Sequence, residues 1–131
     1  MKILITGQAG FIGFHAAIGF KNDGWEVHGI DNFNDYYDVK LKRDRATILQ
    51  DLGISTIDDT IENFNKIDFP EYDLILHLAA YTNPRHALKT QQPYIDTNIT
   101  ATQRIIDVAQ DKGTPVVYAS SSCVMLGQPL P

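Results

Sequence analysis

The feature that most constrains this chain is a glycine loop lying between an apolar run and a helical stretch. Residues 3–5 are continuously apolar, which is typical of a strand covered on both faces in a parallel sheet. The loop that follows has the spacing G-x-x-G-x-x-G and carries Gly7, Gly10 and Gly13. A helical stretch over about residues 11–20 comes next. This order predicts the strand, loop and helix that begin a nucleotide-binding α/β unit.

Strand and helix patterns alternate along the rest of the chain. We expect further strands at 25–30, 54–57, 73–80 and 115–120, and helices at 39–52, 60–66 and 94–110. In the last helix we expect five residues to point inward: Ile95, Ile99, Ile105, Ile106 and Ala109. Such alternation predicts right-handed crossovers and an α/β fold, a Rossmann-like doubly wound parallel sheet of about five strands. The later strands of the full fold are not expected here.

Size and composition limit the remaining classes. A chain of 131 residues predicts a single NAD(P)-binding domain over 1–131, without a separate substrate domain. The net charge of −5 argues against nucleic acid and acidic membranes as partners. Cys123 is the one cysteine, so no intrachain disulfide forms and the cytoplasm is the expected location. The amino terminus resembles neither a signal peptide nor a membrane span.

Two groups of polar residues are interpreted as having no ligand. The four histidines lack the spacing of metal ligands, so no metal site is expected. The cations between residues 40 and 45 are spread around a helix and interrupted by Asp44, which favours a solvated face over a nucleic-acid site. These cations are Lys40, Lys42, Arg43 and Arg45.

The glycine loop and the second strand together predict a dinucleotide site. Gly7 permits a tight turn, Gly10 lets the backbone approach a pyrophosphate, and Gly13 lets helix pack close to strand. Asp31 follows the second strand, where its carboxylate would accept hydrogen bonds from the adenosine ribose, which favours NAD over NADP. The alternative interpretation is that the glycines serve close packing alone.

Several motifs carry a resemblance to a known family. The sequence Gly-Phe-Ile-Gly-Phe-His begins at Gly10, a loop Asp-Asn-Phe-Asn-Asp-Tyr-Tyr-Asp begins at Asp31, and His-Leu-Ala-Ala begins at His77. Tyr94 opens a Tyr-x-x-x-Asn run, and a serine-rich turn follows the last strand. The chain resembles the extended short-chain dehydrogenase/reductase family, in particular its NAD-dependent nucleotide-sugar epimerases and dehydratases, and most of all those acting on UDP-glucuronate.

The resemblance implies a set of site residues. Ser121 matches the hydroxyl that bonds the sugar oxygen losing its proton, although a serine there can also simply satisfy a turn. Asn98 either supports the site's hydrogen-bond network or bonds locally within its helix. Substrate binding is implied for Arg85 and Ser122. Cofactor binding is implied for Gly7, Gly10, Phe11, Ile12, Gly13, Asp31, Asn32, Asp58, Leu78, Ala79, Ala80 and Asn98.

The family's catalytic base belongs to a Tyr-x-x-x-Lys run after the serine turn, and no such run follows Ser121. Tyr36 and Lys40 have this spacing, but they lie beside the adenosine end and are interpreted as a loop aromatic and a solvated lysine. Residues 124–127 also depart from the family's Val-Tyr-Gly. We therefore expect an NAD-binding part that is inactive alone, with UDP-sugar binding only when a C-terminal part completes it.

The alternative is a non-catalytic nucleotide-binding or protein-interaction module derived from that family. A homo-oligomer or a partner chain is expected in either case, because the helix over 94–110 lies at the dimer interface in this family and the edge beyond the fifth strand is exposed.

Overall fold

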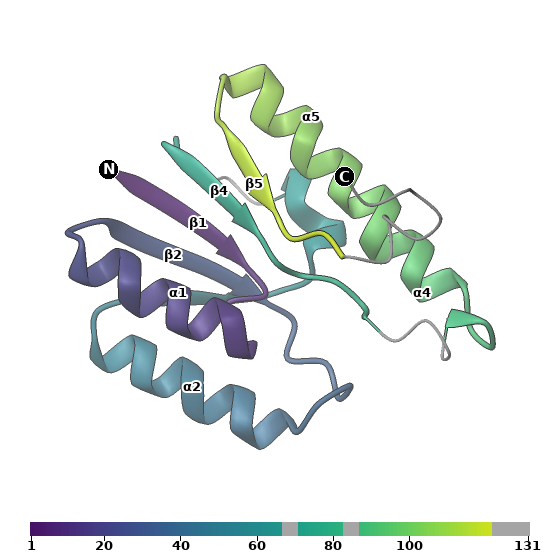
Figure 1. Cartoon of the computed structure of the whole chain (residues 1–131), viewed down its shortest axis with the longest axis horizontal. Helices are drawn as coiled ribbons and strands as arrows, with labels where there is room; N and C mark the ends of the chain where they lie inside the picture. The colour runs from purple at the N-terminus through teal and green to yellow at the C-terminus, as the bar shows by residue number, and fades with distance from the viewer. Residues whose placement is uncertain (67–70, 83–86, 122–131) are drawn as a thin grey trace, which may run out of the picture.

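The computed structural model describes residues 1–66, 71–82 and 87–121. Five parallel strands form one sheet in the order β3-β2-β1-β4-β5. Their bounds are β1 Lys2–Thr6, β2 Glu26–Asp31, β3 Ser55–Asp58, β4 Leu74–His77 and β5 Val116–Tyr118. All strands point the same way, so their carboxyl ends meet at one edge of the sheet (Figure 1). The predicted α/β class and parallel five-stranded sheet are confirmed.

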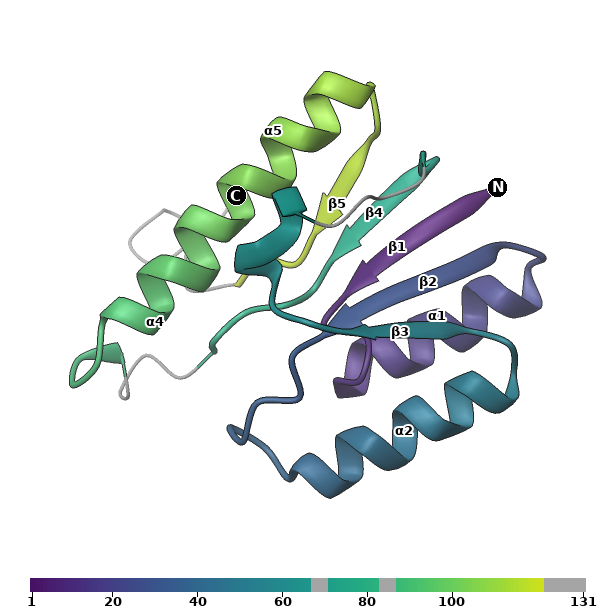
Figure 2. The same cartoon turned by 180° about the vertical axis from the view of Figure 1, so that it is seen from behind.

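Helices cover both faces of the sheet (Figures 1 and 2). One face carries α1 (Phe11–Asn22) and α2 (Val39–Asp51), and the other carries η1 (Ile61–Lys66), α4 (Gln92–Tyr94), η2 (Ile95–Ala101) and α5 (Thr102–Lys112). Among the described residues, no helix is both long enough and apolar enough to cross a membrane.

The central strand β1 explains why two cores form. Ile3, Leu4 and Ile5 are fully buried. Ile3 and Ile5 pack with Ala17 of α1 and Leu49 of α2. Leu4, pointing the opposite way, packs with residues of η1, η2 and α5. Because alternate side chains of a strand face opposite sides, the continuous apolar run is what a strand between two helical layers requires.

Helix ends follow local signals in the sequence. The Asp38 side chain caps α2 by accepting the Lys40 main-chain N–H at 2.8 Å. Gly113 ends α5 with φ of +68°, a conformation that residues with a side chain rarely adopt. The segment predicted as a helix over 60–66 is a 3₁₀ helix, η1.

The helix predicted over 94–110 differs in two respects. It consists of α4, a π-helical segment η2, and α5. Its buried residues recur every fourth position and are Thr97, Ala101, Ile105 and Ala109. The expectation that Ile95, Ile99 and Ile106 point inward is wrong, since their exposed fractions are 39%, 64% and 38%. Ile105 and Ala109 are buried as expected, the rest of the buried face consists of Thr97 and Ala101, and Ile95, Ile99 and Ile106 face outward.

Candidate functional site

The glycine loop joins β1 to α1 at the carboxyl edge of the sheet, where parallel α/β folds bind ligands. Gly7 has φ of +69° and its N–H donates to the carbonyl oxygen of Ile30 on β2 at 2.8 Å. A Cβ on Gly13 would lie 2.3 Å from the Gly7 carbonyl oxygen, so the first turn of α1 approaches the loop as only glycine permits. Gly7 and Gly13 therefore have the turn and packing roles that their spacing indicated.

The amino terminus of α1 faces the same edge with its N–H groups. Gly10 is the N-cap, no side chain caps the helix, and the first turn has no acidic residue. Phe11 and Ile12 follow it and are 66% and 64% exposed. A helix start of this kind, reached by glycine backbone, suits an anion such as a pyrophosphate.

Asp31 braces the loop from the end of β2. Its side chain is nearly buried, and its two carboxylate oxygens accept the N–H groups of Ala9 at 3.0 Å and Phe33 at 2.9 Å. A carboxylate oxygen has two lone pairs, so each oxygen can still accept one further donor. The arrangement fixes the carboxylate beside the glycine loop, where a pair of ribose hydroxyls could reach it.

The loop after Asp31 is held by residues that the sequence did not indicate. Phe33 has φ of +48°, unusual for a residue with a side chain, and the Arg43 guanidinium lies 3.7 Å from its ring centroid. Asn32 is exposed, and its side chain accepts the Asn34 N–H at 3.1 Å within the loop. This local bond leaves Asn32 without an interaction toward the glycine loop in the described structure.

The cations of α2 are not all solvated, which corrects the sequence-based interpretation. Lys42 is buried, and its Nζ donates to the carbonyl and side-chain oxygens of Asn34 at 2.9 and 2.7 Å. Arg45 donates to the Ala9 carbonyl oxygen at 3.3 Å. Sequence reasoning missed these roles because a lysine is rarely buried unless it is paired, and only the path of the loop supplies the partner.

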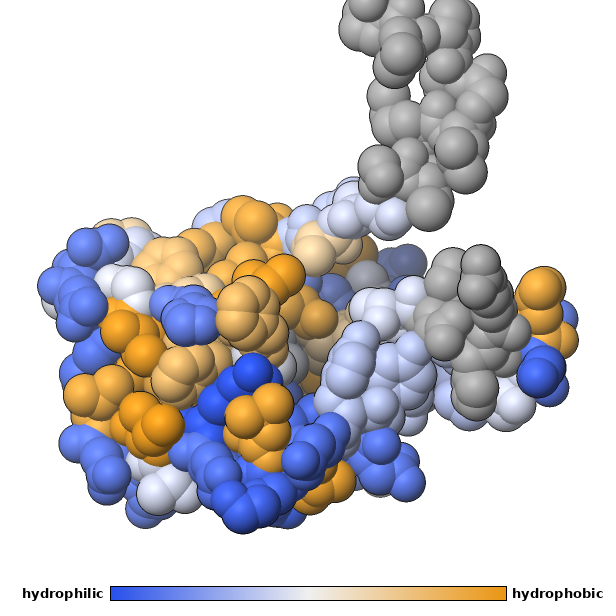
Figure 3. Space-filling model, turned by 60° about the horizontal axis from the view of Figure 1, so that its bottom comes forward, coloured by the Kyte–Doolittle hydropathy of each residue, from blue (hydrophilic) through white to orange (hydrophobic). Residues whose placement is uncertain are grey.

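A cavity of about 310 Å³ lies between α2 and β3 at the expected adenosine end. Asp58, half-exposed, forms an ion pair with Arg43 at 2.8 Å. Thr56 lines the same cavity and donates to Oε1 of the fully buried Gln8 at 2.5 Å. Gln8 thus links the glycine loop to β3. Figure 3 shows hydrophobic residues gathered on one part of the molecular surface. The exposed large apolar side chains of α1, α2 and the end of α2 are Phe11, Ile12, Leu41, Ile48 and Leu52.

The turn after β4 lies against the glycine loop. A Cβ on Gly7 would lie 2.9 Å from the Ala79 nitrogen, so the two backbones are in direct contact. Leu78 and Ala79 both donate their N–H groups to the Thr6 hydroxyl at 3.1 Å. Ala80 is exposed at this edge.

Asn98 reaches out of its own helix. Its Oδ1 accepts the Tyr81 N–H at 2.9 Å, and its Nδ2 donates to the Tyr81 carbonyl oxygen at 2.8 Å. Of the two alternatives for this residue, local bonding within the helix is therefore wrong. The Tyr81 ring also lies 6.0 Å from Tyr36 and 5.3 Å from Tyr94, centroid to centroid. Asn98 thus fixes the segment that follows β4.

The catalytic and substrate residues are only partly within the described structure. Ser121 is exposed and follows β5 at the same edge as the glycine loop. Arg85 and Ser122 lie outside the described residues, as does Cys123. Lys40 of the Tyr36–Lys40 pair is exposed and donates to Asp44 at 2.6 Å, and this bond raises its pKa. Lys40 is thus solvated, as its position in the sequence indicated.

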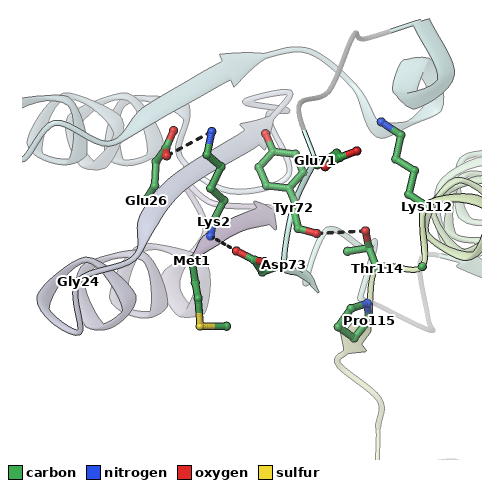
Figure 4. A pocket seen from close by; sticks show the side chains of 11 residues that line it. Met1, Lys2, Gly24, Glu26, Glu71, Tyr72, Asp73, Lys112, Thr114 and Pro115 are labelled. Atoms are coloured by element: carbon green, nitrogen blue, oxygen red, sulfur yellow. Dashed lines mark hydrogen bonds and ion pairs between the residues drawn. The ribbon is translucent and has the colours of Figure 1, made fainter.

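A larger cavity of about 900 Å³ lies at the opposite edge, at the amino ends of the strands (Figure 4). Its polar groups already interact with one another: Lys2 pairs with Glu26 at 3.4 Å, and its main-chain N–H donates to Asp73 at 2.6 Å. None of the glycine loop's residues line it. The carboxyl edge therefore remains the candidate site. Within the described part of the chain, no three His, Cys, Asp or Glu side chains are grouped as metal ligands would be.

Comparison with known proteins identifies the family. The model of the NAD dependent epimerase/dehydratase family matches residues 3–129. The chain belongs to this family. It is 37% identical over 130 residues to UDP-glucuronate 4-epimerase 6 of Arabidopsis thaliana, covering 95% of this chain and 28% of the plant protein. It is 41% identical to the uncharacterized protein MJ1055 of Methanocaldococcus jannaschii, covering 96% of this chain and 41% of that protein.

Solved structures agree with this assignment. The UDP-glucuronic acid 4-epimerase of Bacillus cereus, crystallised as a mutant with NAD and a fluorinated UDP-glucuronic acid, superposes with a TM-score of 0.87 at 31% identity. That match covers the whole of this chain and 43% of the bacterial one. The chain therefore spans less than half the length of these relatives.

Proposed function

We propose that this segment binds NAD and is the cofactor-binding part of a nucleotide-sugar 4-epimerase of the UDP-glucuronate type. The observation that carries the proposal is the position of Asp31, whose carboxylate accepts main-chain N–H groups from both the glycine loop and the loop after β2. The family and the relatives named above support it. The close backbone contacts at Gly7 and Gly13 support it too, because dinucleotide-binding folds use such a tightly packed glycine loop to bring the start of a helix to a pyrophosphate.

Each part of the site suits one part of the dinucleotide. We assign the pyrophosphate to the N–H groups at the start of α1, and the adenosine ribose to Asp31. Asp58 and Thr56, which line the cavity beside β3, would contact the adenine. The segment of Leu78, Ala79 and Ala80 would border the nicotinamide half, with Asn98 holding Tyr81 behind it. NAD bound there would accept a hydride from the sugar and return it.

The chain's own residues would contribute less to the chemistry than to binding. Ser121 is proposed to bond the reacting sugar oxygen, with Arg85 and Ser122 toward the substrate. The one Tyr-x-x-x-Lys spacing in the 131 residues is Tyr36–Lys40, and Lys40 bonds Asp44 instead of the tyrosine. We therefore propose that turnover, and binding of a UDP-sugar, need residues outside this segment.

Calorimetry with NAD tests the binding proposal. We expect heat of binding for the chain, and affinity about tenfold or more weaker in Asp31→Asn, because the carboxylate's charge-assisted bonds to the ribose are lost. NADP should bind more weakly than NAD, since its 2′-phosphate would face the same carboxylate. Asp73→Asn is the matched control: this carboxylate accepts the Lys2 N–H at the opposite edge, so its loss should not change NAD affinity.

A folded chain that gives no heat with NAD would refute the proposal. Equal affinities for Asp31→Asn and the unchanged chain would refute the assignment of Asp31 to the ribose. Urea unfolding of each variant shows whether it is folded.

Self-association is the second part of the proposal. Ile95, Ile99 and Ile106 are exposed along η2 and α5, and a second copy of the chain would cover them. We also propose the cytoplasm as the compartment. The one cysteine of these residues cannot form an intrachain disulfide, so they do not require an oxidising environment.

A further inference from the structure

A buried hydrogen-bond network passes through His77 at the end of β4. The His77 side chain is 6% exposed, and its Nδ1 lies 2.7 Å from the Thr6 hydroxyl of β1. Its Nε2 lies 2.9 Å from the Thr102 hydroxyl of α5. The ring thus connects the central strand to the helical layer that carries Asn98, immediately beside the turn that contacts the glycine loop.

The hydrogen-bond donors and acceptors around the His77 ring determine its protonation state and tautomer. A hydroxyl has one donor and two acceptor sites, and the Thr6 oxygen accepts the N–H groups of Leu78 and Ala79 at 3.1 Å each. Its proton is therefore donated to Nδ1 of His77. The ring must be neutral, with its own proton on Nε2, which donates to Thr102. The Thr102 hydroxyl donates in turn to the carbonyl oxygen of Thr97.

Protonation of His77 conflicts with this arrangement. A proton on Nδ1 would face the Thr6 oxygen, whose two acceptor sites are already used. Thr6 could accept it only by releasing Leu78 or Ala79. Leu78 also donates to the Thr6 carbonyl oxygen at 3.2 Å, whereas Ala79 has, among the described residues, the Thr6 hydroxyl as its acceptor. Ala79 is the residue whose backbone touches Gly7.

The surroundings of His77 offer its charged form little support. Two charged residues are connected to this network through Thr97, namely Glu62 of η1 and Arg104 of α5, and Tyr118 of β5 lies beside His77 in the sheet. Glu62 accepts from the Thr97 hydroxyl, and Arg104 donates to the Glu62 carbonyl oxygen at 2.6 Å. Tyr118 is paired with His77 across the sheet and is mostly exposed. Burial lowers the pKa of His77 below its ordinary value of 6.5.

We propose that His77 is a positioning residue whose neutral ring, through Thr6, holds the Leu78–Ala79 turn against the glycine loop, so that protonating it weakens dinucleotide binding. This inference rests on the proposed function. It makes the cofactor site pH-sensitive through a residue that does not touch the cofactor.

The test compares the pH dependence of NAD affinity in the unchanged chain and in His77→Asn. The Asn side-chain oxygen can accept the Thr6 proton in place of Nδ1 but does not titrate. We expect the affinity of the unchanged chain to stay constant above about pH 6.5 and to fall once the pH is lowered through the pKa of His77, by up to roughly tenfold for each pH unit below it. His77→Asn should change less than about twofold over the same range.

His28→Asn is the matched control, because His28 bonds Tyr72 and Glu26 toward the other edge of the sheet. It should keep the unchanged chain's pH profile. An equal fall in affinity in His77→Asn, or no fall in the unchanged chain, would overturn the proposal.

Two NMR measurements test the proposed role of His77 in the absence of the cofactor. The ring ¹⁵N shifts should report the Nε2-protonated tautomer at about pH 8, and they also show the pH at which the ring is protonated. The Ala79 amide should lose protection from exchange at that pH in the unchanged chain but not in His77→Asn. An Nδ1-protonated neutral ring, or equal Ala79 protection with the ring neutral and protonated, would overturn the inference. Absence of NAD binding at about pH 8 would refute the proposed function alone.

Discussion

Gly13 and Gly19 belong to the same helix, α1, but their surroundings differ. A Cβ on Gly13 would lie 2.3 Å from the Gly7 carbonyl oxygen and 2.8 Å from Cα of Gln8, both of them backbone atoms. A Cβ on Gly19 would meet nothing within 4 Å. The same substitution therefore tests close approach at one position and helix propensity at the other.

We expect Gly13→Ala to lower the free energy of unfolding by about 1–3 kcal/mol, because the loop must move away from the helix. Gly19→Ala should raise it by about 0.5–1 kcal/mol, since alanine loses less backbone entropy in a helix. Urea unfolding of the two variants measures both. Equal effects at the two positions would show that Gly13 is not needed for the approach of α1 to the loop.

Among single residues, the sequence predicts the roles of those whose position is set by their neighbours along the chain. The spacing of Gly7, Gly10 and Gly13 and the place of Asp31 after a strand are enough to locate the loop. It does not predict that Lys42 is buried or that the Thr6 hydroxyl is hydrogen-bonded to the His77 ring. These depend on which segments lie side by side after folding, up to 71 residues apart along the chain.

Among the elements, the helical region from Gln92 to Lys112 shows most clearly why a pattern can mislead. Five of its residues were expected to be buried, and of these Ile105 and Ala109 are. Thr97 and Ala101 complete the buried face. Periodicity finds an apolar face but not what covers it. The π-helical segment η2 adds to the difference, because it shifts the phase of the side chains within the helix. The isoleucines left outside are the basis of the proposed self-association.

We expect the chain to show the mass of a dimer or higher oligomer in light scattering, and Ile99→Asp to shift it to the monomer, because a charge would be buried in the contact. Ile48→Asp is the control: Ile48 is 47% exposed on α2, on the other face of the sheet, and should leave the mass unchanged. A monomeric unchanged chain at high concentration would contradict the proposed contact.

For the molecule as a whole, alternation of strands and helices was sufficient to predict a parallel sheet with two helical layers. It did not predict which edge of the sheet has the larger hollow. The cavity of about 900 Å³ lies at the amino ends of the strands, whereas the glycine loop, Asp31 and the turn after β4 meet at the carboxyl ends. Size alone would therefore favour the amino edge, whereas the chemistry of the backbone donors favours the carboxyl edge, which is the proposed site.

The most direct measurement is a map of backbone amide NMR shifts as NAD is added to the chain. The account predicts that the amides that shift are those of residues 7–13, 31–33 and 78–80, with Asp58 beside them. The amides around the amino-edge cavity, Lys2, Asp73 and Thr114, should not move. Shifts confined to the amino edge, or none with excess NAD, would contradict the claim that the glycine loop and Asp31 form a dinucleotide site.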